Sequence, residues 1–208
     1  DDSDNVVNAI QSTRKCNCGV LNTSESFPQA KWNRWTHNMF DTWGRLYSTR
    51  VYHSIPLSGE GQANANFLET LYGYDLMGNR NRIIESSGTI RRAVYDARGL
   101  VVSTWMGTND RGATDGNPAG AGGLNSMRLI LALEYDNGVA GGDGNVTKET
   151  KPVDDSSVND RETDFAYDYR NRRITTQRTD GVEVWITLVG FDNLNRLIQT
   201  TTFRTSEI

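Results

Sequence analysis

The chain has 208 residues, 36% of them hydrophobic, which suits one domain or a short run of repeats. Its 26 acidic and 22 basic residues give a net charge of -4, without the clustered basic face of nucleic-acid-binding domains. No apolar run approaches the roughly 20 residues of a membrane-spanning helix. We therefore expect no nucleic-acid partner and no membrane span. Residues 1–4 resemble no part of an export signal, so we expect any such signal to be removed or to lie outside this chain.

The first 31 residues precede the patterned part of the chain. We predict that residues 1–31 form an N-terminal segment, either a capping arm or a strand exchanged with a neighbour, and that residues 32–208 form a β-sheet domain. Cys16 and Cys18 are separated by one residue, a spacing that strains a disulfide, so we interpret them as ordinary thiols. An intermolecular bridge or a shared metal site are the alternatives.

Three tryptophans, Trp32, Trp35 and Trp43, mark the start of the predicted sheet domain. Their main interpretation is packing in the core or at an interface. The alternative is contact with glycans, because an indole ring matches the flat apolar face of a sugar. Two sequons, at Asn22 and Asn145, are candidate glycosylation sites in a secreted protein.

A short unit recurs six times: an aromatic residue, Asp, a turn, and then Arg or Leu leading into a strand. The units begin at Phe40, Tyr74, Tyr95, Tyr135, Tyr167 and Phe191. Asp can accept backbone N–H groups and close a turn, and Gly or Asn three residues later tolerates a left-handed backbone. The predicted turn residues are Asp41, Gly44, Asp75, Gly78, Asp96, Gly99, Asp136, Asp168, Asn171, Asp192 and Asn195.

Alternating apolar and polar residues flank these turns and predict strands. The chain is therefore predicted to be all-β, with tandem antiparallel hairpins in a curved or spiralling sheet. We expect the aromatic residues of successive units to stack along that sheet. Residues 107–125, 137–145 and 151–161 are rich in Gly, Asp and polar residues; we expect them to be loops at one edge, the first too polar to pack.

The motif Phe40–Leu46 and its five relatives resemble the YD repeat of the Rhs/YD family, bacterial surface and toxin-associated proteins related to animal teneurins. The resemblance covers residues 40–203. It implies hairpins aligned in a spiralling antiparallel sheet, which in large members of the family closes into a hollow shell.

Residues for catalysis are scarce, so we expect no enzyme activity. The two histidines, His37 and His53, have no matching nucleophile motif, and no phosphate-binding loop occurs. Asp136, Asp143 and Asn145 are weak candidates for calcium; the main interpretation of these residues is turn formation, with no cofactor.

A stack of hairpins leaves its first and last strands unpaired, and unpaired strands attract further strands. We therefore predict a non-enzymatic extracellular or cell-surface structural protein of bacteria that assembles through sheet edges into a fibre, biofilm matrix or surface layer. Its partners would be copies of itself or further YD repeats. The alternatives are part of an Rhs-type shell enclosing a toxin cargo, or a carbohydrate-binding adhesin module.

Overall fold

The computed structural model describes residues 5–13, 27–121, 125–139, 141–154, 156–179 and 183–206. Within them the regular structure is β-strand with three short 3-10 helices (Gln29–Lys31, Asp136–Gly138 and Ser157–Asn159), so the all-β prediction is confirmed. None of the helices in these ranges is long and apolar enough to cross a membrane. Cys16, Cys18 and Asn22 lie outside the described residues.

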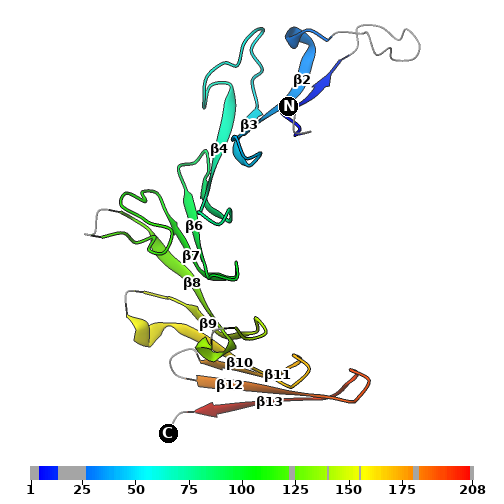
Figure 1. The fold of residues 1–208 in the computed structure, drawn as a ribbon, viewed down its shortest axis with the longest axis vertical. Coiled ribbons are helices and arrows are strands. Elements are labelled where there is room, and N and C mark those ends of the chain that lie inside the picture. The colour runs from blue at the N-terminus through cyan, green and yellow to red at the C-terminus, as the bar shows by residue number, and fades with distance from the viewer. Residues whose placement is uncertain are drawn as a thin grey trace. The chain divides into compact units, whose positions relative to one another are not determined.

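Thirteen strands follow one another in sequence order, each beside its neighbours in the chain (Figure 1). They are β1 (Asn8–Ser12), β2 (Trp32–Phe40), β3 (Leu46–Tyr52), β4 (Phe67–Tyr74), β5 (Arg80–Ile84), β6 (Ile90–Tyr95), β7 (Val101–Gly107), β8 (Arg128–Tyr135), β9 (Val146–Lys151), β10 (Arg161–Tyr167), β11 (Arg173–Thr179), β12 (Glu183–Phe191) and β13 (Leu197–Ser206).

All six repeat turns follow an even-numbered strand. Strands of an antiparallel meander alternate in direction, so within each part of the sheet these turns share one end of the strands. We call this end the repeat-turn edge. The insertions after β7 and β9 lie at the opposite end, whereas residues 137–145 belong to a repeat turn. The expectation that all three insertions share one edge is therefore wrong.

The chain forms two compact units, Asp1–Arg91 and Arg92–Ile208. In the first unit, β1 pairs antiparallel with β2, with Ile10 opposite Trp35. Part of the predicted N-terminal segment is thus a strand within its own chain's sheet.

The core of the first unit is a small aromatic cluster on one face of the sheet. Trp35 stacks on Tyr52 with ring centroids 3.8 Å apart, and Tyr52 contacts Phe67 at 5.1 Å. Trp32 and Ile55 pack against these three buried residues. Tyr52 lies opposite Phe67 in the ladder between β3 and β4, so these two side chains share one face of the sheet. Trp35, on the neighbouring strand β2, stacks on Tyr52 on that face.

The insertion after β7 is anchored to the second unit. Buried Arg92 binds Asp110 at 2.9 Å and donates to the Thr114 carbonyl at 3.3 Å. Pro118 is fully buried. The expectation that this insertion is too polar to pack is wrong, because the ion pair between Arg92 and Asp110 holds it against β6 and Pro118 within it is buried.

The ladder shifts register just before the aromatic residue of the repeat. The shift occurs at Phe40, Tyr74, Tyr135, Tyr167 and Phe191. A bulge of this kind re-aims a side chain and increases the local twist. It therefore sets the direction of the repeat aromatics relative to the turn that follows them.

Gly78 provides a test of the turn conformation. Its φ of 88° is unfavourable for a residue with a Cβ, although the space around it is open. We expect Gly78→Ala to destabilise the chain by about 1–2 kcal/mol in denaturant unfolding. Gly78→Asn should be milder, since Asn171 and Asn195 hold the equivalent position with positive φ. The control, Gly116→Ala, has open space and no positive φ, so it should be neutral; equal losses for both alanine variants would contradict this account.

Candidate functional site

The repeat turns are closed by the Asp carboxylate. In the first turn, one oxygen of Asp41 accepts the backbone N–H groups of Trp43 and Arg45, each at 2.9 Å. Its other oxygen accepts Arg45 Nε at 2.8 Å. Four further aspartates each accept the backbone N–H groups of the residues two and four positions later in their own turns: Asp75, Asp96, Asp168 and Asp192.

The residue three positions after each of these aspartates has positive φ. These residues are Gly44, Gly78, Gly99, Asn171 and Asn195, with φ between 57° and 88°. Their N–H groups donate to the Asp carbonyl, which completes the turn. The same residue types at this spacing were the basis of the sequence prediction.

The fourth turn is built differently because it carries an insertion. Asp136 accepts the N–H groups of Gly144 and Asn145, each at 3.0 Å, and Arg98 Nη1 at 2.9 Å. Both oxygens of this carboxylate thus accept hydrogen bonds from other groups of the chain. In the described part of the chain, no three His, Cys, Asp or Glu side chains form a group that could hold a metal ion. Asp143 is exposed, and Asn145 Nδ2 donates to Asn171 Oδ1 at 2.9 Å.

Sequence reasoning missed a further turn, between β5 and β6. The N–H of Glu85 donates to the Thr89 carbonyl at 2.8 Å, and that of Gly88 donates to the Glu85 carbonyl at 2.9 Å. These are the backbone bonds of the repeat turns, with Glu in the place of Asp and no aromatic residue before it. The available signal was the Gly three residues after an acidic residue.

Successive hairpins are joined through the tyrosine hydroxyl of the repeat. Tyr74 donates to the Leu46 carbonyl at 2.7 Å, and Tyr135 donates to the Val101 carbonyl at 2.9 Å. Tyr167 donates to the Val146 carbonyl at 2.9 Å. Each acceptor is the first residue of the strand after the preceding repeat turn.

The arginines of three repeat turns, the first, third and fifth, cover the aromatic ring of the next repeat. The guanidinium carbons of Arg45 and Arg172 lie 4.7 Å and 4.9 Å from the ring centroids of Tyr74 and Phe191. Arg98 lies 5.8 Å from the ring of Tyr135. The contact between these repeats is therefore arginine over an aromatic ring rather than the ring-on-ring stacking expected from the sequence.

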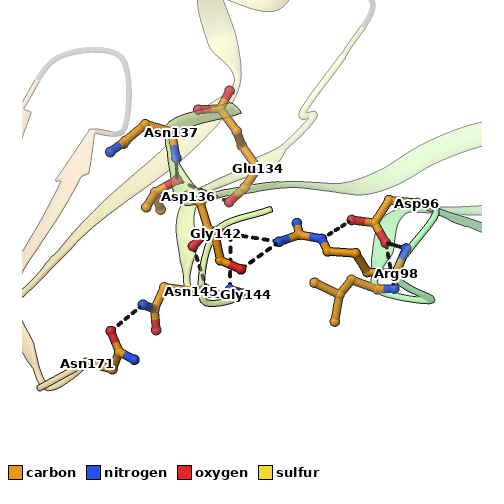
Figure 2. A network of polar contacts seen from close by, with 11 residues as sticks. Asp96, Arg98, Glu134, Asp136, Asn137, Gly142, Gly144, Asn145 and Asn171 are labelled. Atoms are coloured by element: carbon orange, nitrogen blue, oxygen red, sulfur yellow. Dashed lines mark hydrogen bonds and ion pairs between the residues drawn. The ribbon is translucent and has the colours of Figure 1, made fainter. Parts of the chain in front are cut away.

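In the second unit, polar side chains also join the turns along the repeat-turn edge (Figure 2). Arg98 bridges Asp96 and Asp136, with 2.9 Å to each carboxylate, and donates to the Gly142 carbonyl. Figure 2 shows the chain of contacts continuing from Asn145 to Asn171. Arg172 then donates to the Asp192 carbonyl at 3.0 Å. We call these contacts the turn ladder.

The turn ladder keeps its carboxylates ionised. Hydrogen bonds from the Arg172 side chain, against some burial, lower the pKa of Asp168 from 3.8 to about 2. The Arg98 hydrogen bond likewise lowers the pKa of Asp136. Bonds to Asp136 and Asp96 raise the pKa of Arg98. Near neutral pH these groups are charged, and each is bound to a partner of opposite charge.

A second polar cluster lies beside the aromatic core of the first unit. Arg50 binds Glu69 at 2.8 Å and Glu60 at 2.6 Å, and buried Ser48 donates to Glu69 at 2.9 Å. Burial by itself raises the pKa of Glu69, but the bonds from Arg50 and Ser48 more than offset this and lower it. His37 Nδ1 lies 3.8 Å from Glu60. Within the described part of the chain, His37 Nδ1 is buried and has no hydrogen-bond partner.

The three tryptophans expected to pack in the core or at an interface, with glycan contact as the alternative, have different surroundings. Trp35 is buried, and Trp32 packs against it and donates from Nε1 to the Phe27 carbonyl. Trp43 is 78% exposed, with Arg45 lying 4.7 Å over its ring. Glycan contact by these tryptophans and glycosylation at Asn145 stay predictions.

The hydroxyl contact between hairpins can be tested at Tyr167. Tyr167→Phe keeps the ring and removes the bond to the Val146 carbonyl, so we expect a loss of about 1 kcal/mol in the free energy of unfolding. Tyr169→Phe is the matched control because Tyr169 is an exposed residue of the adjacent turn. Indistinguishable midpoints of unfolding for the two variants would show that the hydroxyl does not stabilise the junction.

The pKa of Asp168 predicts an acid-sensitive contribution to stability. A carboxylate with a depressed pKa in the folded chain stabilises that state above its unfolded pKa, and the effect is lost as the pH falls through the folded value. The contribution of Asp168 should therefore be complete above about pH 5 and shrink between about pH 4 and pH 2. Asp168→Asn should make unfolding, followed by denaturant titration across this range, less dependent on pH. Asp143→Asn, at an exposed position, should keep the original slope; an unchanged slope for Asp168→Asn would contradict the assignment.

No family model and no curated protein matches the chain. Solved structures do match. One chain of the crystal structure of TcdB2-TccC3 with Cdc42 has a TM-score of 0.55 and 16% identity, over 81% of this chain and 8% of that one. The crystal structure of TcdB2-TccC3 alone gives the same score and identity, over 83% of this chain and 8% of that one. The Tc holotoxin pore of Photorhabdus luminescens gives a TM-score of 0.54 and 15% identity, over 81% of this chain and 7% of the matched chain.

The chain therefore spans less than a tenth of the length of the solved chains that it matches. At this identity the likeness concerns the fold. It supports an Rhs-related fold for the chain, in agreement with the repeats seen in its sequence.

Proposed function

We propose that this chain is a wall segment of an Rhs-type shell that encloses a polypeptide cargo, acting outside the producing cell without a catalytic role of its own. The observation that carries the proposal is the repeated junction, in which the arginine of the first, third and fifth repeat turns lies over the aromatic ring of the next hairpin. Such a junction extends a sheet by repetition. The likeness to TcdB2-TccC3 and to a Tc holotoxin supports the shell over the other functions inferred from the sequence.

One exposed face of the sheet in the second unit carries side chains suited to contact with another polypeptide, which supports the proposal. On one face of the second unit, Thr163, Arg178, Trp185 and Arg204 stand opposite one another on adjacent strands, β10 to β13. A hollow of about 950 Å³ is lined in part by three members of this row, Thr163, Arg178 and Trp185. Trp185 is partly exposed there. Aromatic and arginine side chains are enriched where proteins contact other polypeptides.

The fibre, matrix or surface-layer function remains a prediction that no comparison supports.

Electron microscopy of the native protein that carries this segment tests the proposal. We expect hollow particles, together with a co-purifying polypeptide that resists added protease until the particles are opened by denaturant. Mass spectrometry before and after opening identifies the protected polypeptide. Filaments or flat arrays would contradict the shell and favour the fibre. Hollow particles whose contents are digested at once would contradict cargo enclosure.

A further inference from the structure

The junctions between repeats define a receptor for an aromatic residue. It has two parts: the arginine of a repeat turn, and the carbonyl of the first residue of the strand that follows. Arg45 and Leu46 together receive Tyr74 in this way, and Arg98 and Val101 receive Tyr135. We call this pair of groups the aromatic socket.

The last repeat turn carries the same two parts. Arg196 Nε donates to Asp192 Oδ2 at 2.7 Å, as Arg172 Nε does to Asp168. Arg196 is nevertheless 74% exposed, whereas Arg45 and Arg172 are 30% and 18% exposed beneath the next repeat. Leu197 occupies the position of Leu46 and Val101, and its side chain is 61% exposed.

The strand beside this socket is an edge strand among the described residues. β13 pairs with β12 over its whole length, and no described strand lies on its other side. Leu197, Ile198 and Phe203 all leave large apolar surfaces exposed on it. A long exposed edge with apolar side chains is a template for a further strand.

We propose that the β13 edge, with the socket of Arg196 and Leu197, docks the first strand of a further hairpin repeat: an antiparallel strand that ends in Tyr-Asp. Its tyrosine hydroxyl donates to the Leu197 carbonyl, and its ring lies under Arg196. Arg196 keeps its bond to Asp192 throughout, as Arg45 keeps its bond to Asp41. This inference rests on the proposed function, because it names the partner that continues the wall.

Continuity with the junctions inside the chain favours this occupant over a second copy. β1 of a copy reads Asn-Ala-Ile-Gln-Ser, so it brings no aromatic–Asp end to the socket. Two β13 strands related by a two-fold axis would pair antiparallel, but each would bring the Thr205–Ser206 end of the other near Leu197. Neither arrangement reproduces the contacts of Tyr74 and Tyr135.

The test uses the intact 208-residue chain and a synthetic peptide of its own residues 161–179, the hairpin that contains Tyr167 and Asp168. The peptide is titrated into the chain and amide hydrogen exchange is measured at each concentration. Binding should slow exchange along β13. We expect this at millimolar peptide, since an isolated hairpin is only marginally folded. The same peptide with Tyr167→Phe should bind about threefold to tenfold more weakly, because it lacks the hydroxyl.

Variants of the chain test the socket itself. Arg196→Lys keeps the charge and loses the planar guanidinium, so binding should weaken about twofold to fivefold. Arg34→Ala, an exposed arginine of β2, should bind like the unchanged chain. Exchange that stays unchanged on β13, equal binding of the Tyr and Phe peptides, or self-association through β13 would each overturn the inference.

The two proposals fail separately. Hollow particles without peptide binding at β13 would overturn the socket alone. Peptide binding at β13 together with filaments in micrographs would keep the socket and overturn the shell.

Discussion

One contact recurs at three junctions of the sheet: an arginine that is held by the aspartate of its own turn lies over the aromatic ring of the next hairpin. The aspartate fixes the turn and the arginine together, since its two oxygens bind backbone N–H groups on one side and the guanidinium on the other. A rigid guanidinium then offers a flat cationic surface to a ring. The same motif therefore acts twice, once within a hairpin and once between hairpins.

This contact adds to the hydrogen bonds between strands in a sheet with little buried apolar surface. The aromatic core of the first unit consists of three buried residues with two more packed against them, and many apolar side chains on the strands stay exposed. A stack of repeats gains stability from each interface with a neighbour rather than from one large core. At these interfaces the tyrosine hydroxyl bond, the arginine–ring contact and the turn ladder each contribute a small part of the stability.

Much of this could be inferred from the sequence because the turn chemistry is local. An Asp followed three residues later by Gly or Asn closes a turn by its own atoms, so the positions of Asp41 and Gly44 carry the information whatever surrounds them. The turn at Glu85 was missed because its residues depart from the motif, although its backbone bonds are the same. Insertions were harder to predict. Asp110 is an ordinary loop residue in the sequence, and only the fold brings it to buried Arg92.

The sequence alone determined the strand class, the number of repeat turns and the residues that close them, because in five of the six turns the closing contacts lie within about five positions along the chain. The tertiary structure decided what the aromatic residues contact, since a register shift before each ring aims it at the preceding hairpin, 21 to 34 positions away for the three tyrosines. The tertiary structure also decided the contacts of the fourth turn, where Asp136 binds Arg98 of the preceding repeat turn. Register and long-range pairing depend on which side chains meet across strands, and no local pattern specifies that meeting.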